Sequence, residues 1–390
     1  MQIPVLNIDR LIEDEKKVEE KIKKKQRARE DLSYGRLIFI QFRKHKAAQI
    51  GMIVLILLYL IVIFADFVAP YDPQRRLKVQ YIPPQTIHFF DEDNNFHLRP
   101  FVYGYKMETN KETFRRKYVI DTEKKYPLYF FVRGDSYKLW RIFDSDIHLF
   151  GVKGEGGLFL PFGSDQLGHD LFSQTVFGGR ISLTIALIGV LIITMIGVII
   201  GGISGFVGGT TDNLIQRFIE VIRSIPMIPL WMGIAAALPS NWPQSKVFIS
   251  VVIIISLFGW TTLARVVRGK FISLREEDFI MAAKVNGSNQ FQIILKHMIP
   301  NFIGYILVNM TITIPMMILG ETALSFLGLG LRPPTISWGV LLQNAQGLQN
   351  LSFYPWLLIP GVFVIISVIA FNIVGDGLRD AFDPYAVTRR

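Results

Sequence analysis

The chain has 390 residues, a formal net charge of +10 and a mean hydropathy of +0.34, and it contains no cysteine. The lack of cysteine excludes disulfide bonds, thiolate metal sites and cysteine nucleophiles. Apolar runs of about 20 residues alternate with charged blocks, which excludes a disordered chain and disfavours a single soluble domain.

Six apolar runs are long enough to cross a membrane as helices, because a hydrocarbon core of about 30 Å requires about 20 helical residues. They are Ile50–Val68, Ile181–Val207, Leu214–Leu238, Val247–Ala264, Phe302–Leu329 and Trp356–Val374. The third run is the least regular, since it opens with Arg217, Glu220 and Arg223. The sequence therefore predicts an all-α integral membrane protein with six transmembrane helices.

The distribution of Lys and Arg predicts the orientation of these spans, because short cytoplasmic loops are rich in both residues. Thirteen Lys and Arg residues precede the first span, and six more lie between residues 265 and 300. We therefore expect residues 1–49 to form a basic cytoplasmic arm, residues 50–69 the first span and residues 379–390 a cytoplasmic tail. The positive net charge then reflects orientation rather than a nucleic-acid partner.

Residues 70–180 separate the first two spans and should form an extracytoplasmic insertion. The part between Asp72 and Leu160 carries 15 basic and 12 acidic residues, so it should be well solvated. Its aromatic runs Tyr126–Val132 and Trp140–Phe143 favour short strands, with Gly and Asp residues between them. We therefore expect a small β-rich domain on this side of the membrane.

The second span carries four glycines spaced by four residues, which are Gly197, Gly201, Gly205 and Gly209. This spacing places them on one face of a helix, where small residues let another helix approach closely. We interpret the face as a helix-packing surface, although a pore lining would show the same pattern.

Four prolines fall within the third, fifth and sixth spans, at Pro226, Pro229, Pro315 and Pro360. Each removes a backbone donor and predicts a kink. Kinked spans suit a moving pathway, and ordinary bending of membrane helices would give the same pattern.

Ionisable residues within the spans lie near their ends, as Asp66 and Glu321 do, and no acid–base chain crosses the middle of a span. This disfavours a transporter driven by protons or sodium. No P-loop is present, since Gly269-Lys270 is followed by Phe271, and the six histidines are scattered. We therefore predict no catalytic residue, metal site or cofactor in this chain, so the energy for uphill transport would come from a partner.

The segment from Arg275 to Pro300 is the best candidate for contact with that partner. Residues 276–285 favour a short helix with acidic residues in its first turn, which matches the helix dipole. Asn286-Gly287 should end this helix, because Gly tolerates positive φ. A second short helix is expected over residues 291–297. Such a loop could insert into a groove of another protein or remain a surface amphipathic loop.

This loop resembles the "EAA" loop of ABC importer permeases. Ala282, Ala283, Gly287 and Pro300 occur at the spacing of that motif. The family's leading Glu, its Ile and its Leu are replaced by Met281, His297 and Ile299. These replacements are similar to those in the dipeptide/oligopeptide branch of the family.

Three further stretches resemble the same family. They are the segment leading into the second span, the exit of the fifth span and the C-terminal signature, at residues 162–183, 321–339 and 375–384. The resemblance covers nearly all of residues 36–72 and 160–386 and is specifically to the second, C-type permease subunit of peptide importers.

The resemblance implies a type I ABC importer permease with a transmembrane core over residues 181–378 and a cytoplasmic coupling loop over residues 268–300. The residues that would couple to an ATPase are Glu277, Asp278, Met281, Ala282, Ala283, Val285, Asn286, Gly287, His297 and Pro300. It also implies a homologous second permease, two ATPases that hold ATP and Mg, and an extracytoplasmic solute-binding protein as partners. The chain itself would be a transport subunit rather than an enzyme.

The resemblance further implies a location in a prokaryotic plasma membrane and favours oligopeptides as the substrate, with oligosaccharides as the alternative. Two other classes stay open on the residues alone. A secondary transporter or channel would work without partners, and a receptor would need a cytoplasmic signalling domain. The insertion would contact the binding protein, cover the pore mouth or place its aromatic residues on a sugar.

Overall fold

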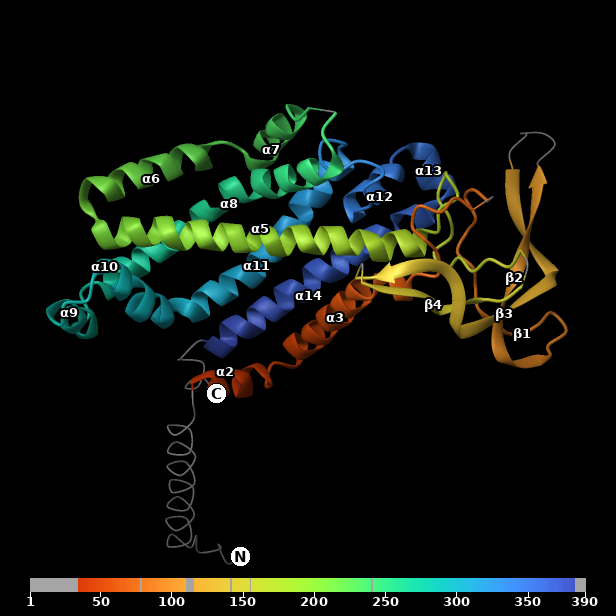
Figure 1. Ribbon diagram of the computed structural model, residues 1–390, viewed down its shortest axis with the longest axis horizontal. Helices are drawn as coiled ribbons and strands as arrows, with labels where there is room; N and C mark the ends of the chain where they lie inside the picture. The colour runs from red at the N-terminus through yellow and green to blue at the C-terminus, as the bar shows by residue number, and fades with distance from the viewer. Residues whose placement is uncertain are drawn as a thin grey trace, which may run out of the picture.

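The computed structural model describes residues 34–77, 79–109, 116–140, 142–154, 156–239 and 241–382. Residues 1–33 of the expected N-terminal arm and residues 383–390 of the expected tail therefore lie outside the described residues. Long helices run side by side through the molecule, and a small sheet lies beyond one end of them (Figure 1).

The helices, in chain order, are α2 (Tyr34–Phe42), α3 (Lys46–Ile63), α4 (Ala65–Val68), α5 (Leu171–Val207), α6 (Gly209–Ser224), α7 (Met227–Ala236), α8 (Gln244–Leu274), α9 (Asp278–Val285), α10 (Gln290–Gln292), α11 (Ile299–Phe326), α12 (Trp338–Asn344), α13 (Leu348–Phe353) and α14 (Ile359–Phe382). A π-helical segment, Ile293–Met298, joins α10 to α11, and a 3₁₀ turn, Pro355–Leu358, precedes α14. Among the described residues, five helices are long and apolar enough to span a membrane.

The expected third span is a bent pair rather than one straight helix. Helices α6 and α7 meet at an angle of 82°, and counting the pair as one span gives six. The break lies at Pro226, which caps α7 and follows the extended residue Ile225. Pro360 lies where the 3₁₀ turn gives way to α14, in the first turn of that helix, where a missing N–H costs little. Helix α11 continues through Pro315.

Helix α5 begins ten residues before the apolar run that predicted it. The Asp170 carboxylate caps it by accepting hydrogen bonds from the N–H groups of Phe172 and Ser173 at 3.3 and 2.9 Å. The helix has 37 residues, and at 1.5 Å per residue it is about 55 Å long. It therefore exceeds the hydrocarbon core, which is about 30 Å thick.

The insertion folds as one antiparallel four-stranded sheet in the order β1-β2-β3-β4. Its strands are β1 (His88–Phe90), β2 (Phe96–Thr109), β3 (Arg116–Leu139) and β4 (Phe143–Val152). The strand expected at residues 126–132 lies within β3. The strand expected at residues 140–143 is wrong except at Phe143, which begins β4, because Trp140 and Ile142 lie in the β3–β4 turn, where Trp140 has φ +52° and Ile142 N donates to Leu139 O.

The main core lies between α5, α8, α11 and α14, where side chains such as Val190, Ile255, Ile318 and Phe371 are buried. The outer faces of the long helices are also apolar, and α3 exposes Ile53, Ile56 and Leu57 among others. Apolar residues on both the inner and outer faces are what a lipid environment requires. The predicted fold class, a helical membrane protein with a small β insertion, is therefore confirmed.

Candidate functional site

The loop between α8 and α11 contains a short helix with clearly defined ends. Helix α9 follows the extended residue Glu277 and ends in a Schellman motif, in which Ser288 N donates to Ala283 O at 3.1 Å and Gly287 N to Lys284 O at 3.0 Å. Gly287 has φ +76°, a conformation that favours glycine. The sequence pattern thus places the turn where the structure has it.

The chain then turns directly into the fifth expected span. Asn289 and Gln292 form a capping box, with Gln292 N donating to Asn289 Oδ1 at 2.8 Å and Asn289 N to Gln292 Oε1 at 3.3 Å. The π-helical segment after it contains His297, which is half-buried, and the exposed Pro300 lies in the first turn of α11. Helix α10, the π-helical segment and α11 therefore form one continuous helix, Gln290–Phe326, and a turn over residues 286–289 separates it from α9.

The loop has one buried and one exposed face. Ile280 and Ala283 are buried in a cluster with Phe206, Phe271 and Met298. The residues of the sequence-derived set that face outward on α9 and its turn are Glu277, Asp278, Met281, Ala282, Val285, Asn286 and Gly287. Ala283, which belongs to the same set, faces the core of the molecule instead.

Two apolar side chains stand out on the exposed face. Met281 and Val285, four residues apart on one face of α9, have exposed fractions of 52% and 86%, whereas Phe279, at 40%, lies beside the buried face. We call Met281 and Val285 the α9 patch. An exposed apolar group on an ordered polar loop is typical of an interaction surface.

Three of the four glycines in the predicted packing face lie on α5 and pack against α8. A Cβ at Gly197 would lie 3.0 Å from Leu263 Cβ, one at Gly201 would lie 2.4 Å from Ala264 O, and one at Gly205 would lie 2.5 Å from Arg268 O. Gly209 lies beyond the end of α5 with φ +60° and no atom within 4 Å of a built Cβ. It therefore has no packing contact of this kind.

A half-buried ion pair at the same end of the molecule was not apparent from the sequence. Arg268 of α8 donates from Nε and Nη2 to the two carboxylate oxygens of Asp212 of α6, both at 2.5 Å, and Ser204 of α5 donates to the same carboxylate. Bidentate Arg–carboxylate pairs are specific in geometry. This pair fixes α6 against α8.

A second buried cluster ties α11 to α5 and α12. Glu321, expected near a hydrated span end, has an exposed fraction of 0%. Its carboxylate accepts hydrogen bonds from the hydroxyls of Ser182 at 2.8 Å, Ser325 at 2.8 Å and Ser337 at 2.7 Å. Trp338 N in turn donates to Ser182 Oγ at 3.2 Å. The carboxylate and the three serine hydroxyls all have hydrogen-bond partners. The cluster therefore links α11 to α5 and to the start of α12.

Comparison with known proteins identifies the family of this arrangement. Residues 193–386 match the model for the binding-protein-dependent transport system inner membrane component, and residues 33–84 match the N-terminal TM domain of oligopeptide transport permease C. The oligopeptide transport system permease protein OppC of Bacillus subtilis is 39% identical over 224 residues, which is 57% of this chain and 71% of the relative. The chain belongs to the family of binding-protein-dependent transport permeases.

Two further relatives of the permease, an OppC and a DppC protein, support the same assignment. OppC of Haemophilus influenzae is 45% identical over 57% of this chain and 70% of its own length. The dipeptide transport system permease protein DppC of Bacillus subtilis is 37% identical over 57% of this chain and 68% of its own length. Among solved structures, an inward-facing MetNI methionine ABC transporter has a TM-score of 0.41 at 18% identity, covering 54% of this chain and 97% of that one. The resemblance to peptide-type ABC importer permeases is confirmed by the relatives.

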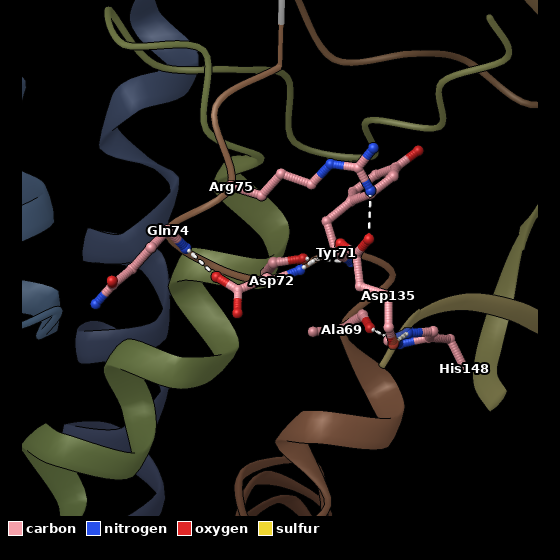
Figure 2. A network of polar contacts seen from close by, with 8 residues as sticks. Ala69, Tyr71, Asp72, Gln74, Arg75, Asp135 and His148 are labelled. Carbon is pink, nitrogen blue, oxygen red and sulfur yellow. Dashed lines mark hydrogen bonds and ion pairs between the residues drawn. The ribbon is translucent and has the colours of Figure 1, made fainter. Parts of the chain in front are cut away.

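The sheet of this permease lies between its two family matches, which end at residue 84 and begin again at residue 193. The junction between sheet and spans is polar (Figure 2). Arg75 Nη1 donates to Asp135 Oδ1 at 2.5 Å, and Asp72 N donates to Asp135 Oδ2 at 3.2 Å. Burial acts to raise the pKa of Asp135, but these hydrogen bonds and nearby positive charge bring that pKa below its ordinary value.

His148 of β4 fastens the same junction. Its Nδ1 lies 2.5 Å from Ala69 O and its Nε2 lies 2.9 Å from Asp135 O (Figure 2). Both partners are carbonyl oxygens, which accept hydrogen bonds from the N–H groups of an imidazole ring. The sheet is thereby fixed to the residue after α4.

Proposed function

We propose that the permease forms half of a translocation pathway for oligopeptides in an ATP-driven importer. An extracytoplasmic solute-binding protein would deliver the peptide, a homologous permease would supply the other half, and two ATPases would bind ATP and Mg. The family description and the names of the relatives support this proposal. Oligosaccharides on the same pathway are the alternative substrate.

The observation that carries the proposal is the α9 patch. Met281 and Val285 are presented by a helix whose opposite face is fixed by buried Ile280 and Ala283. A short helix with an apolar outer face suits insertion into a groove of another protein. The sequence contains no P-loop, so we infer that this other protein is the ATPase.

The contacts behind the patch offer a route for coupling. Motion of α9 would pass to the π-helical segment, which packs against α9, and from there into α11, because that segment and α11 are helically continuous. Helix α11 carries Glu321, whose hydrogen bonds reach Ser182 of α5 and Ser337 before α12. A shift of α9 would thereby reach three elements of the core.

The proposed orientation places α9 in the cytoplasm and the sheet outside. The two lie at opposite ends of the helical bundle (Figure 1). His45, at the start of α3, lies 3.9 Å from Asp380 near the end of α14, so the first and last spans begin and end on one side. This arrangement supports cytoplasmic termini in a plasma membrane, with the sheet available to the solute-binding protein.

The first test changes the helix end that positions the patch. Gly287→Leu forces a leucine into φ +76°, whereas the matched control Gly35→Leu, in α2, also has open space around the Cβ but no positive φ. In proteoliposomes holding the full complex, we expect Gly287→Leu to abolish peptide uptake and peptide-stimulated ATP hydrolysis, while Gly35→Leu retains both. Equal activity of the two variants would contradict the coupling role.

The second test separates the importer from a stand-alone transporter or channel. The purified chain alone should neither hydrolyse ATP nor transport labelled oligopeptide into liposomes, because the ATPases would be separate subunits. Uptake by liposomes that contain only this chain would refute the importer assignment.

A further inference from the structure

An apolar pocket of about 730 Å³ separates the β3–β4 hairpin from the end of the first span. Helices α3 and α4 line it with Leu60, Phe64 and Phe67, and the hairpin lines it with Phe131 and Phe143 among others. Ring contacts border it on two sides, with Phe67 and Phe131 at 6.1 Å between centroids and Phe64 and Trp140 at 5.4 Å.

The pocket lies at the depth where the first span leaves the hydrocarbon core. Helix α3 has 18 residues, which gives about 27 Å and matches one hydrocarbon thickness. Ile63 is its last residue, and Trp140 Nε1 donates to Ile63 O at 3.1 Å. The hairpin tip is thereby fixed at the level where tryptophan and tyrosine favour the membrane–water interface. Strand β4 lies beside this end of the helix in Figure 1.

The surface around the pocket continues the lipid-facing side of α3. Leu57, Leu60 and Ile63 are exposed on the helix. On the hairpin, Ile142 and Phe143 have exposed fractions of 70% and 59%. All five of these exposed side chains are apolar. An apolar surface therefore runs from the span onto the sheet.

Two aromatic residues of the hairpin have backbone angles that are energetically unfavourable. Phe131 and Trp140 have φ values of +55° and +52°, a region that aromatic residues rarely adopt. Such strain persists only where surrounding structure enforces it, and it is often associated with function. Here it accompanies the placement of both rings against α3 and α4.

We propose that the β3–β4 hairpin is an interfacial membrane anchor and that its pocket holds an acyl chain of a phospholipid in the adjacent leaflet. The charges of the hairpin favour an apolar rather than an electrostatic interaction. Lys138 lies 3.4 Å from Asp144 and Arg133 lies 3.8 Å from Asp146, so the described basic residues have acidic neighbours. A zwitterionic phospholipid therefore suffices, and the sheet is held against the bilayer rather than free in solution.

The lack of cysteine allows a direct test by site-directed spin labelling. One nitroxide is attached at Ile142→Cys and, separately, at Leu98→Cys, an exposed position of β2 away from the pocket. The full chain, with the subunits that purify with it, is placed in phosphatidylcholine nanodiscs. We expect the ratio of collisions with oxygen to collisions with a water-soluble nickel complex to be several-fold higher at residue 142.

Two results at residue 142 would overturn the proposal. A ratio equal to that at residue 98 would place the hairpin in water. Exclusion of both collision reagents would show that another subunit, rather than lipid, covers the surface. Both labels replace exposed side chains, so neither variant removes buried packing.

A matched pair of variants tests the pocket itself. Phe130 and Phe131 are adjacent and similarly exposed, but Phe131 lines this pocket and Phe130 lines a different one. Phosphatidylcholine with a nitroxide on its acyl chain should show a motionally restricted fraction that Phe131→Ser decreases and Phe130→Ser does not. Equal effects of the two variants, or a restricted fraction seen only with anionic lipid, would overturn the acyl-chain site.

Discussion

Replacing Gly201 by alanine should separate α5 from α8. The added Cβ would lie 2.4 Å from Ala264 O and 2.8 Å from Ala264 Cα. Both neighbours are backbone atoms, so no rotation of a side chain relieves the contact. One of the two helices must therefore move.

The adjacent residue supplies the control. A Cβ at Gly202 meets the Phe271 ring at 3.4 Å, an ordinary contact. Both changes gain the same helix propensity of about 1 kcal/mol, and overpacking at Gly201 alone costs about 1–3 kcal/mol. The free energy of unfolding of Gly201→Ala should therefore lie below that of Gly202→Ala by about 1–3 kcal/mol, where each 1.4 kcal/mol is about tenfold in the equilibrium constant.

The difference can be measured by reversible unfolding in detergent micelles with increasing dodecyl sulfate, followed by circular dichroism. The Gly201→Ala transition should occur at a lower dodecyl sulfate fraction than that of Gly202→Ala. A Gly201→Ala protein as stable as the control would refute the close backbone contact between α5 and α8.

The polar contacts give three further predictions. Glu321→Ala leaves buried serine hydroxyls without an acceptor and should lower the free energy of unfolding by about 2–3 kcal/mol or more. Glu321→Gln should lower the free energy of unfolding by less. Melting curves of both variants in detergent test this. The folded pKa of Asp135 is depressed below its ordinary 3.8, so its contribution is present above pH 4 and is lost as pH falls through the folded pKa. The hydrogen-exchange protection factors at residues 69–75, which allow for the intrinsic slowing of exchange in acid, should therefore fall as pH falls, and Asp135→Asn should remove that dependence. Arg268→Lys keeps the charge but not the bidentate geometry, so exchange in α6 should increase; unchanged exchange would contradict the role of the Asp212 pair.

The sequence alone predicts the features that depend on local pattern. Apolar runs of sufficient length predict the positions of the spans, and the Asn286-Gly287 pair predicts the end of α9, because the glycine alone allows positive φ at low cost. The insertion is recognisable as β-rich from its aromatic residues. These features depend on neighbours in the chain.

Features that depend on distant partners escape the same reasoning. The 82° bend at Pro226 is larger than the loss of one hydrogen bond requires, so tertiary packing sets its angle. The turn at Trp140 looks like a strand because aromatic residues favour strands. Glu321 and Ser182 are 139 residues apart, and Asp212 and Arg268 are 56 apart. No periodic pattern links such pairs.

The length of α5 has a mechanical consequence for the whole permease. The helix runs without a break from its cap beside the sheet to the glycines at its far end, next to α6. Because an uninterrupted helix about 55 Å long behaves as a stiff rod, a tilt of about 10° pivoting at one end displaces the other by about 10 Å. A small rotation of α5 at its capped end would therefore become a large displacement at the opposite end of the bundle.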